Sequence, residues 1–124
     1  MTDGRVQHLM LKSNTRRARV TGADLHYKGR IAVDKAPMEA ADRIPNERVH
    51  VLNSSNGARA ETYVIPGRRN SGDTVLIGEF AGLAQVIDPV IILPYACRVR
   101  EAAERSRPAL VSVDGDNRLQ GDTG

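Results

Sequence analysis

The sequence contains a single cysteine, Cys97, no tryptophan and only 3% aromatic residues. One cysteine excludes a disulfide within the chain, and we expect its thiol to be buried and chemically idle. The longest apolar run, residues 90–93, is far too short to cross a membrane. The first twelve residues contain no apolar stretch of signal-peptide length, so we expect a cytoplasmic protein.

The 124 residues are 40% hydrophobic and 27% charged, which is typical of one globular domain with a modest core. The net charge is +3, and the basic residues cluster at positions 16–19 and 68–69. Because aromatic residues are scarce and no nucleic-acid-binding motif is present, we interpret these clusters as a solvated basic face. We therefore expect neither nucleic acid nor a membrane as a partner.

Short runs of alternating or continuous apolar residues predict a small, mainly β fold with short helices. Asn56-Gly57 indicates a tight turn between two antiparallel strands, since both residue types tolerate positive φ angles. Helical turns are predicted over residues 37–43, 79–85 and 98–107. Strands are predicted over residues 17–21, 30–34, 47–53, 59–66, 74–77, 90–93 and 110–113.

Several ordered motifs resemble the pyruvoyl-dependent aspartate 1-decarboxylase family. They are Ala23-Asp24-Leu25-His26-Tyr27 followed by Gly29, Ile31-Ala32-Val33-Asp34, Asn56-Gly57 with Arg59 and Thr62-Tyr63, Val90-Ile91-Ile92, Arg107-Pro108, and Val113-Asp114 with Asn117. The resemblance implies a double-psi β-barrel over residues 10–117, an N-terminal extension over 1–9 and a tail over 118–124. It also implies a homo-tetramer with active sites between neighbouring subunits.

The resemblance further implies roles for individual residues. Arg59 matches an arginine that binds a substrate carboxylate, and a planar bidentate donor suits that task. Tyr63 matches a tyrosine that delivers a proton after carbon dioxide leaves, and Thr62 matches a hydroxyl that assists self-processing. Tyr27 matches an active-site tyrosine. From the sequence alone, the less favoured interpretation of Arg59 is a surface residue beside the turn, and Thr62 and Tyr63 could simply be strand residues on a pleated surface.

The chain also departs from the family pattern. The family has a serine after the glycine that matches Gly29, and the chain breaks there while that serine becomes the pyruvoyl cofactor. Here the residue is Arg30, whose guanidinium is not a nucleophile and cannot become a pyruvoyl group. Asn14 stands at the position of a family lysine, Arg16 at that of a histidine and Glu79 at that of a neutral amide.

We therefore treat Gly29 and Arg30 as a degenerate processing site that stays uncleaved, with no cofactor and no metal. Lys12, two residues before Asn14, is a weak candidate to replace the missing lysine. Because a buried charge needs a partner, we expect Arg30 to pair with Glu79 in the space of the pyruvoyl group. Candidate catalytic residues are Tyr63, Glu79 and Tyr27; candidate substrate-binding residues are Arg59, Arg30, Thr62 and Asn14.

Three functions are consistent with these residues. The leading hypothesis is an unprocessed relative that performs acid–base chemistry, such as proton transfer, cyclisation or dehydration, on a small anionic substrate in a specialised biosynthetic pathway. The first alternative is a catalytically inactive subunit that binds a metabolite or assembles with a true decarboxylase. The second alternative is an ordinary aspartate 1-decarboxylase that makes β-alanine.

Overall fold

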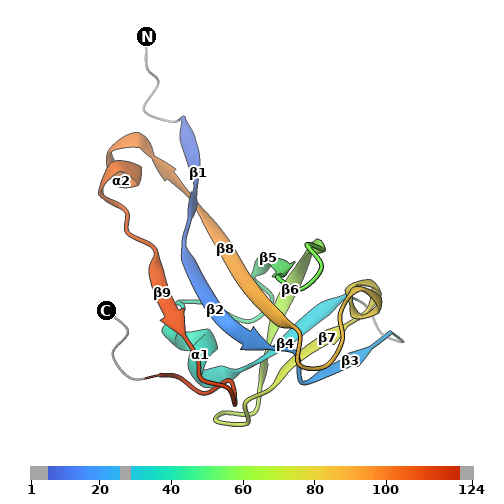
Figure 1. The fold of residues 1–124 in the computed structure, drawn as a ribbon. Coiled ribbons are helices and arrows are strands. Elements are labelled where there is room, and N and C mark those ends of the chain that lie inside the picture. The colour runs from blue at the N-terminus through green and yellow to red at the C-terminus, as the bar shows by residue number, and fades with distance from the viewer. Residues whose placement is uncertain (1–5, 26–28, 121–124) are drawn as a thin grey trace.

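The computed structural model describes residues 6–25 and 29–120. Short strands dominate this part of the chain, and the helices are a turn or two long (Figure 1). None of the described helices is long and apolar enough to cross a membrane. The strands are β1 (Gln7–Leu11), β2 (Ser13–Arg19), β3 (Gly22–Asp24), β4 (Arg30–Asp34), β5 (Arg48–Asn53), β6 (Arg59–Gly67), β7 (Thr74–Ile77), β8 (Pro89–Val99) and β9 (Ala109–Ser112), and the helices are α1 (Lys35–Ala40), η1 (Glu79–Leu83) and α2 (Arg100–Arg105).

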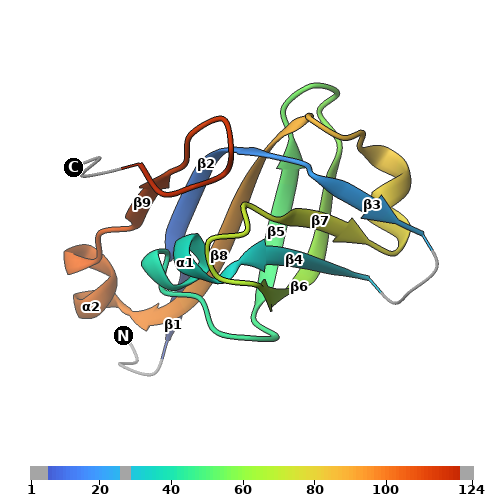
Figure 2. The same ribbon diagram turned by 90° about the horizontal axis from the view of Figure 1, so that it is seen from below.

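One sheet connects the strands in the order β3-β7-β4-β6-β5-β8-β2-β9, and β1 adds to β8. Parallel pairs join β3 with β7, β4 with β6, and β2 with β9, whereas the other pairs are antiparallel. The sheet curls around itself so that β4 and β7 lie opposite the long strands β2 and β8 (Figure 2). This mainly β architecture with short helices agrees with the expected double-psi β-barrel.

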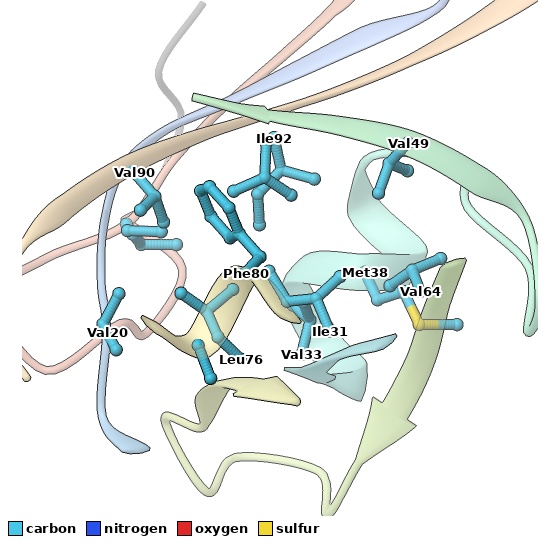
Figure 3. Close-up of a cluster of buried hydrophobic side chains, with 14 residues drawn as sticks. Val20, Ile31, Val33, Met38, Val49, Val64, Leu76, Phe80, Val90 and Ile92 are labelled. Carbon is cyan, nitrogen blue, oxygen red and sulfur yellow. The ribbon is translucent and has the colours of Figure 1, made fainter. Parts of the chain in front are cut away.

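The core lies inside this curled sheet and consists of aliphatic side chains with a single phenylalanine (Figure 3). Alternation along the strands produces it, because every second residue of a strand points to the same face. The residues that fill it are Ala18, Val20, Ile31, Val33, Met38, Val49, Val51, Val64, Leu76, Phe80, Ala81, Val90, Ile92 and Val113.

Two buried polar side chains fasten the loops to the barrel. Asp34 accepts hydrogen bonds from the backbone N–H groups of Ala36, Asn70 and Gly72, each at 2.9 Å. The first of these bonds caps helix α1, which therefore begins at Lys35 rather than near residue 37. Each bond satisfies a backbone donor, so the connection between β6 and β7 is held against β4.

Asn117 performs the same task for the C-terminal loop. Its side chain accepts from the backbone N–H of Arg19 at 2.7 Å and donates to the carbonyls of Arg19 at 2.6 Å and Gly72 at 2.9 Å. The loop lies so close that a Cβ on Gly72 would be 2.4 Å from the carbonyl oxygen of Asp116. Glycine is therefore required there, both for this space and for its φ of +74°.

The predicted strands 30–34 and 74–77 are confirmed at both ends, but other expectations were wrong. Residues 22–24, where no strand was predicted, form β3, and residues 7–11, most of them in the expected N-terminal extension, form β1. Strand β8 continues to Val99 because β1 pairs with its second half. In this pairing Leu9 of β1 lies opposite Cys97. Cys97 lies on this outer extension and is exposed rather than buried.

Candidate active site

Strand β6 carries Arg59 and Tyr63 on its outer face. Exposure alternates along the strand, with residues 59, 61 and 63 exposed and Thr62 and Val64 buried between them. The turn that starts this strand contains Gly57 at a φ of +76°, as the Asn-Gly pair predicts. Arg59 has no ion-pair partner within the described residues, and Tyr63 is 51% exposed. Both side chains are therefore accessible to a ligand.

Arg30 lies beside Tyr63 on the same outer face. Ile31 of β4 pairs with Val64 of β6 in parallel, so the residues that precede them, Arg30 and Tyr63, occupy adjacent positions. On the other side, Tyr63 pairs with Arg48 of β5. Two exposed arginines therefore flank one exposed tyrosine across three strands. Arg48 is paired with Glu61, so the positive charges on this face without an ion-pair partner among the described residues are those of Arg30 and Arg59.

Thr62 points to the opposite side of the strand, toward the segment before β4. Its side chain is 8% exposed, and its hydroxyl oxygen lies 3.7 Å from where a Cβ on Gly29 would be. That buried hydroxyl has no hydrogen-bond partner in the described part of the chain. Gly29 and Thr62 thus form a second group of candidate residues, separated from Arg59 and Tyr63 by the strand itself.

The expected Arg30–Glu79 ion pair is not formed. Arg30 pairs through its backbone with Ile77 of β7, but the chain then turns at Gly78, where φ is 92°, and Glu79 begins η1. Both side chains are exposed, so neither charge requires a partner away from water. Tyr27 was also predicted to belong to this site, and it lies outside the described residues.

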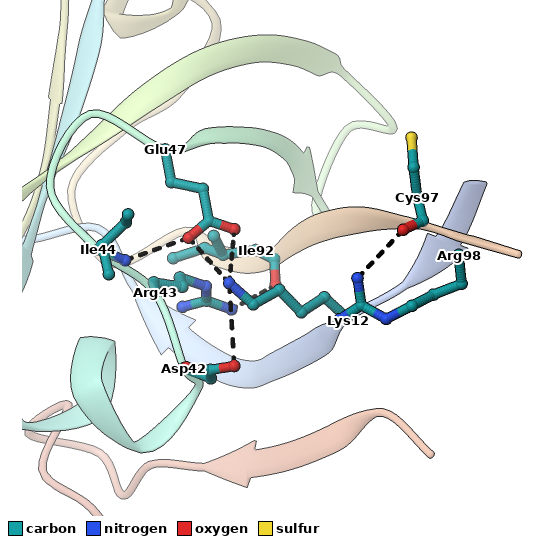
Figure 4. Close-up of polar contacts among 8 residues, drawn as sticks. All are labelled: Lys12, Asp42, Arg43, Ile44, Glu47, Ile92, Cys97 and Arg98. Carbon is teal, nitrogen blue, oxygen red and sulfur yellow. Dashed lines mark hydrogen bonds and ion pairs between the residues drawn. The ribbon is translucent and has the colours of Figure 1, made fainter. Parts of the chain in front are cut away.

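Asn14 and Lys12 lie on and beside strand β2, away from these groups. The side-chain oxygen of Asn14 is buried and has no partner among the residues described. Lys12 pairs with Glu47 at 3.0 Å and lies 3.9 Å from Asp42 (Figure 4). Because these carboxylates bind its ammonium group, Lys12 is not available to replace the family's lysine.

Sequence reasoning missed three charged or polar residues on this face: Arg48, His50 and Glu61. Glu61 contacts both of the others, with His50 Nε2 at 2.7 Å from Glu61 Oε1. The hairpin could have pointed to them, because residues of its two strands pair across the turn, and His50 pairs directly with Glu61. Each strand taken alone shows no motif that marks these residues, so the cluster was not predicted.

Comparison with known proteins identifies relatives along nearly the whole chain. Residues 6–120 match the aspartate decarboxylase family model. An aspartate 1-decarboxylase of Pelotomaculum thermopropionicum is 52% identical over 89% of this chain and 83% of its own length. Those of Thermoanaerobacter pseudethanolicus and Desulfitobacterium hafniense are 47% and 48% identical, over 91% and 87% of this chain and 97% and 85% of their own lengths.

These relatives correct the leading hypothesis from the sequence. We expected Arg30, Asn14 and Glu79 to mark a protein that had been reused for another reaction in a specialised pathway. Proteins that share about half of their residues with this chain, over most of both lengths, are instead named for aspartate 1-decarboxylation. The alternative of an ordinary aspartate 1-decarboxylase is therefore better supported.

Proposed function

Because the chain belongs to the aspartate decarboxylase family, we propose that it acts on L-aspartate and removes its α-carboxylate to yield β-alanine. The observation that carries this proposal is 52% identity, over 89% of the chain, to a protein named aspartate 1-decarboxylase. The accessible guanidinium of Arg59, which has no ion-pair partner within the described residues, supports a dicarboxylate substrate.

In this proposal each candidate residue has a distinct task. Arg59 binds a carboxylate of the substrate through two parallel N–H donors, and Arg30 adds a second positive charge beside Tyr63. The Tyr63 hydroxyl supplies the proton that the substrate carbon needs after carbon dioxide leaves. Glu79 and Tyr27 complete the polar surroundings of the substrate. Thr62 and Asn14 lie away from Arg59 and Tyr63 in one copy, so in this proposal they reach the substrate from a neighbouring subunit.

One observation favours a second candidate function, an aspartate-binding subunit that is not cleaved. Formation of a pyruvoyl group requires a hydroxyl or thiol on the residue after Gly29, and that residue is Arg30. The Thr62 hydroxyl lies nearby but belongs to another strand, so it cannot turn residue 30 into a ketone. The residues present do not fit a pyruvoyl group at this position, and we propose that the Gly29–Arg30 bond stays intact.

One set of measurements separates the two functions. The purified full-length chain is incubated with L-aspartate, β-alanine is quantified, and the intact mass is measured with and without borohydride. β-Alanine formation that is lost in Arg59→Gln but kept in Arg100→Gln supports the decarboxylase. An uncleaved chain that binds aspartate in calorimetry, with the same variant pattern and no β-alanine, supports the binding subunit. If the chain neither forms β-alanine nor binds aspartate, both proposed functions are contradicted.

We also propose a homo-tetramer whose active sites lie between subunits, in a cytoplasmic protein. Its support is that β6 presents Arg59 and Tyr63 on one side and Thr62 on the other, so one copy does not bring all candidates to one surface. A small barrel also gains buried area by assembling. Light scattering at micromolar concentration tests it, and a monomer would contradict it.

A further inference from the structure

A hollow of about 250 Å³ lies on the outer side of the sheet, beside the row formed by Arg30, Tyr63 and Arg48. Neither Arg59 nor Tyr63 lines it. Its volume is below the range typical of pockets for drug-sized ligands, which suits a molecule of metabolite size. The lining residues come from β1, β5, β6 and β8 and are Leu9, Arg48, Val49, His50, Glu61 and Tyr95.

Glu61 organises the polar side of this hollow. One carboxylate oxygen contacts His50 Nε2 at 2.7 Å, and the other accepts a hydrogen bond from the guanidinium of Arg48. The His50 ring also meets the Tyr95 ring edge-to-face, with 5.1 Å between centroids and 79° between planes. The imidazole is therefore held from two sides, by a charge and by an aromatic ring.

This arrangement leaves a defined set of hydrogen-bonding groups without partners. When Nε2 of a neutral His50 donates to Glu61, Nδ1 carries the lone pair and acts as an acceptor. Within the described residues, neither Nδ1 nor the Tyr95 hydroxyl has a hydrogen-bond partner, and Arg48 uses only one of its nitrogens. Both oxygens of Glu61 are already engaged. The hollow thus offers the remaining guanidinium N–H donors of Arg48, whose charge is paired with Glu61, together with an acceptor and a phenol beside the apolar side chain of Leu9.

We propose that this hollow is a binding site for a small α-hydroxy acid with a short apolar side chain. The ligand carboxylate accepts from the free N–H groups of Arg48, and its hydroxyl donates to His50 Nδ1. Its apolar side chain packs against Leu9, which is 68% exposed without a ligand. An α-amino acid fits less well, because its ammonium group would approach Arg48 while both Glu61 oxygens are occupied.

If Arg48, His50 and Glu61 had only a structural role, their substitution would have different measurable effects. His50 and Glu61 face each other on paired strands, and such exposed charge contacts contribute little to stability. If the cluster serves only to join β5 and β6, its substitution changes nothing except a small part of the stability. Ligand-dependent signals from the His50 ring would not occur.

The test follows the His50 ring signals by NMR in the full-length chain during titration with 2-hydroxy-3-methylbutanoate. We expect a saturable shift that the methyl ester, which lacks the charge, does not produce, and a weaker response to 3-methylbutanoate, which lacks the hydroxyl. Arg48→Gln should weaken binding by about tenfold or more, because a charge-assisted hydrogen bond is lost. Leu9→Ser should weaken it severalfold, and Arg100→Gln on helix α2 should leave it unchanged.

The proposal is overturned if no saturable shift occurs, if the ester binds as well as the acid, or if Arg48→Gln binds like the unaltered chain. Arg59→Gln separates this site from the proposed aspartate site. It should abolish the response to aspartate and leave the His50 titration intact, so either proposal can fail without the other. Circular dichroism of each variant confirms that the fold is retained.

Discussion

Asp34 and Thr62 are both buried polar residues on adjacent strands of one barrel. They differ in how many hydrogen-bond partners their side chains have. Asp34 is 1% exposed and accepts three backbone N–H groups, which fasten α1 and the loop before β7. Thr62 is 8% exposed, and its hydroxyl has no partner among the described residues. The polar group at one end of strand β4 is therefore fully hydrogen-bonded, whereas Gly29, before its other end, faces a hydroxyl without a partner in the described part of the chain.

The number of hydrogen-bond partners separates buried polar residues that stabilise the fold from those that are candidates for binding or catalysis. A buried polar group with all its partners stabilises the fold and cannot easily be replaced. A buried polar group without partners costs stability, so its presence indicates another demand, such as a ligand, a neighbouring subunit or a reaction. Asn117 belongs with Asp34 in the first class, and Asn14 belongs with Thr62 in the second.

The largest effect is expected for Asp34→Ala. It removes the acceptor of three backbone N–H groups and the cap of α1, so the free energy of unfolding should fall by about 4 kcal/mol. Urea denaturation measures the loss. Asp73→Ala is the matched control, expected within about 0.5 kcal/mol, because the Asp73 carboxylate makes no hydrogen bond or ion pair with the described residues. If both variants lost the same free energy of unfolding, the hydrogen bonds of Asp34 would not account for its importance to the fold.

Asn117→Ala should have the next largest effect, a loss of about 2 kcal/mol. The substitution removes four hydrogen bonds, and it also places a Cβ-bearing residue other than Asn at a φ of +61°. Asn117→Gly removes the same bonds but tolerates this φ, so it should be less destabilising by about 1 kcal/mol. A Gly variant as unstable as the Ala variant would show that backbone strain is not involved.

Arg43 sharpens the comparison, because it is buried and only partly satisfied. It is 2% exposed and donates to the Ile92 carbonyl at 2.8 Å, while its Nε and Nη1 have no partner in the described part of the protein (Figure 4). Burial lowers the pKa of its guanidinium to about 10, and the nearby charge of Glu47 opposes this shift.

Arg43→Met should therefore stabilise the chain by about 1 kcal/mol, since a poorly paired buried charge is replaced by an apolar side chain of similar length. Thermal and urea unfolding measure the change. Arg100→Met, which removes an exposed arginine paired with Glu104, is the control and should be near neutral. A loss above about 2 kcal/mol in Arg43→Met would place Arg43 with Asp34 instead.

Thr62→Val should have the smallest effect, within about 0.5 kcal/mol, because valine keeps the shape and removes a hydroxyl that has no partner in residues 6–25 and 29–120. Thr74→Val is the matched variant: Thr74 is also buried, but its hydroxyl accepts from Asn117 at 3.3 Å. We expect the Thr74 variant to lose about 1 kcal/mol. If both variants lost the same amount, the Thr62 hydroxyl would have a hidden partner.

Much of the local structure could be predicted because it depends on neighbours in the sequence. The Asn56-Gly57 turn, the strands at 30–34 and 74–77, and the helix after Asp34 all follow from residue type and period. The site was harder to predict, because Arg30, Tyr63 and Arg48 come from three strands. Their adjacency depends on which strands pair and in which register, and the Arg30–Glu79 pair failed for the same reason.

The sequence by itself determined the mainly β fold, the turn at Asn56-Gly57 and the arginine after Gly29, because alternation, turn chemistry and covalent identity are local properties. Only the tertiary structure decided that β1 pairs with β8, that Cys97 is exposed and that the buried Thr62 hydroxyl beside Gly29 has no partner among the described residues. These features depend on contacts between residues far apart in the chain. Any strand with alternating apolar residues can pair with several partner strands. The energies of the long-range contacts decide which pairing forms, because the local sequence pattern does not distinguish between them.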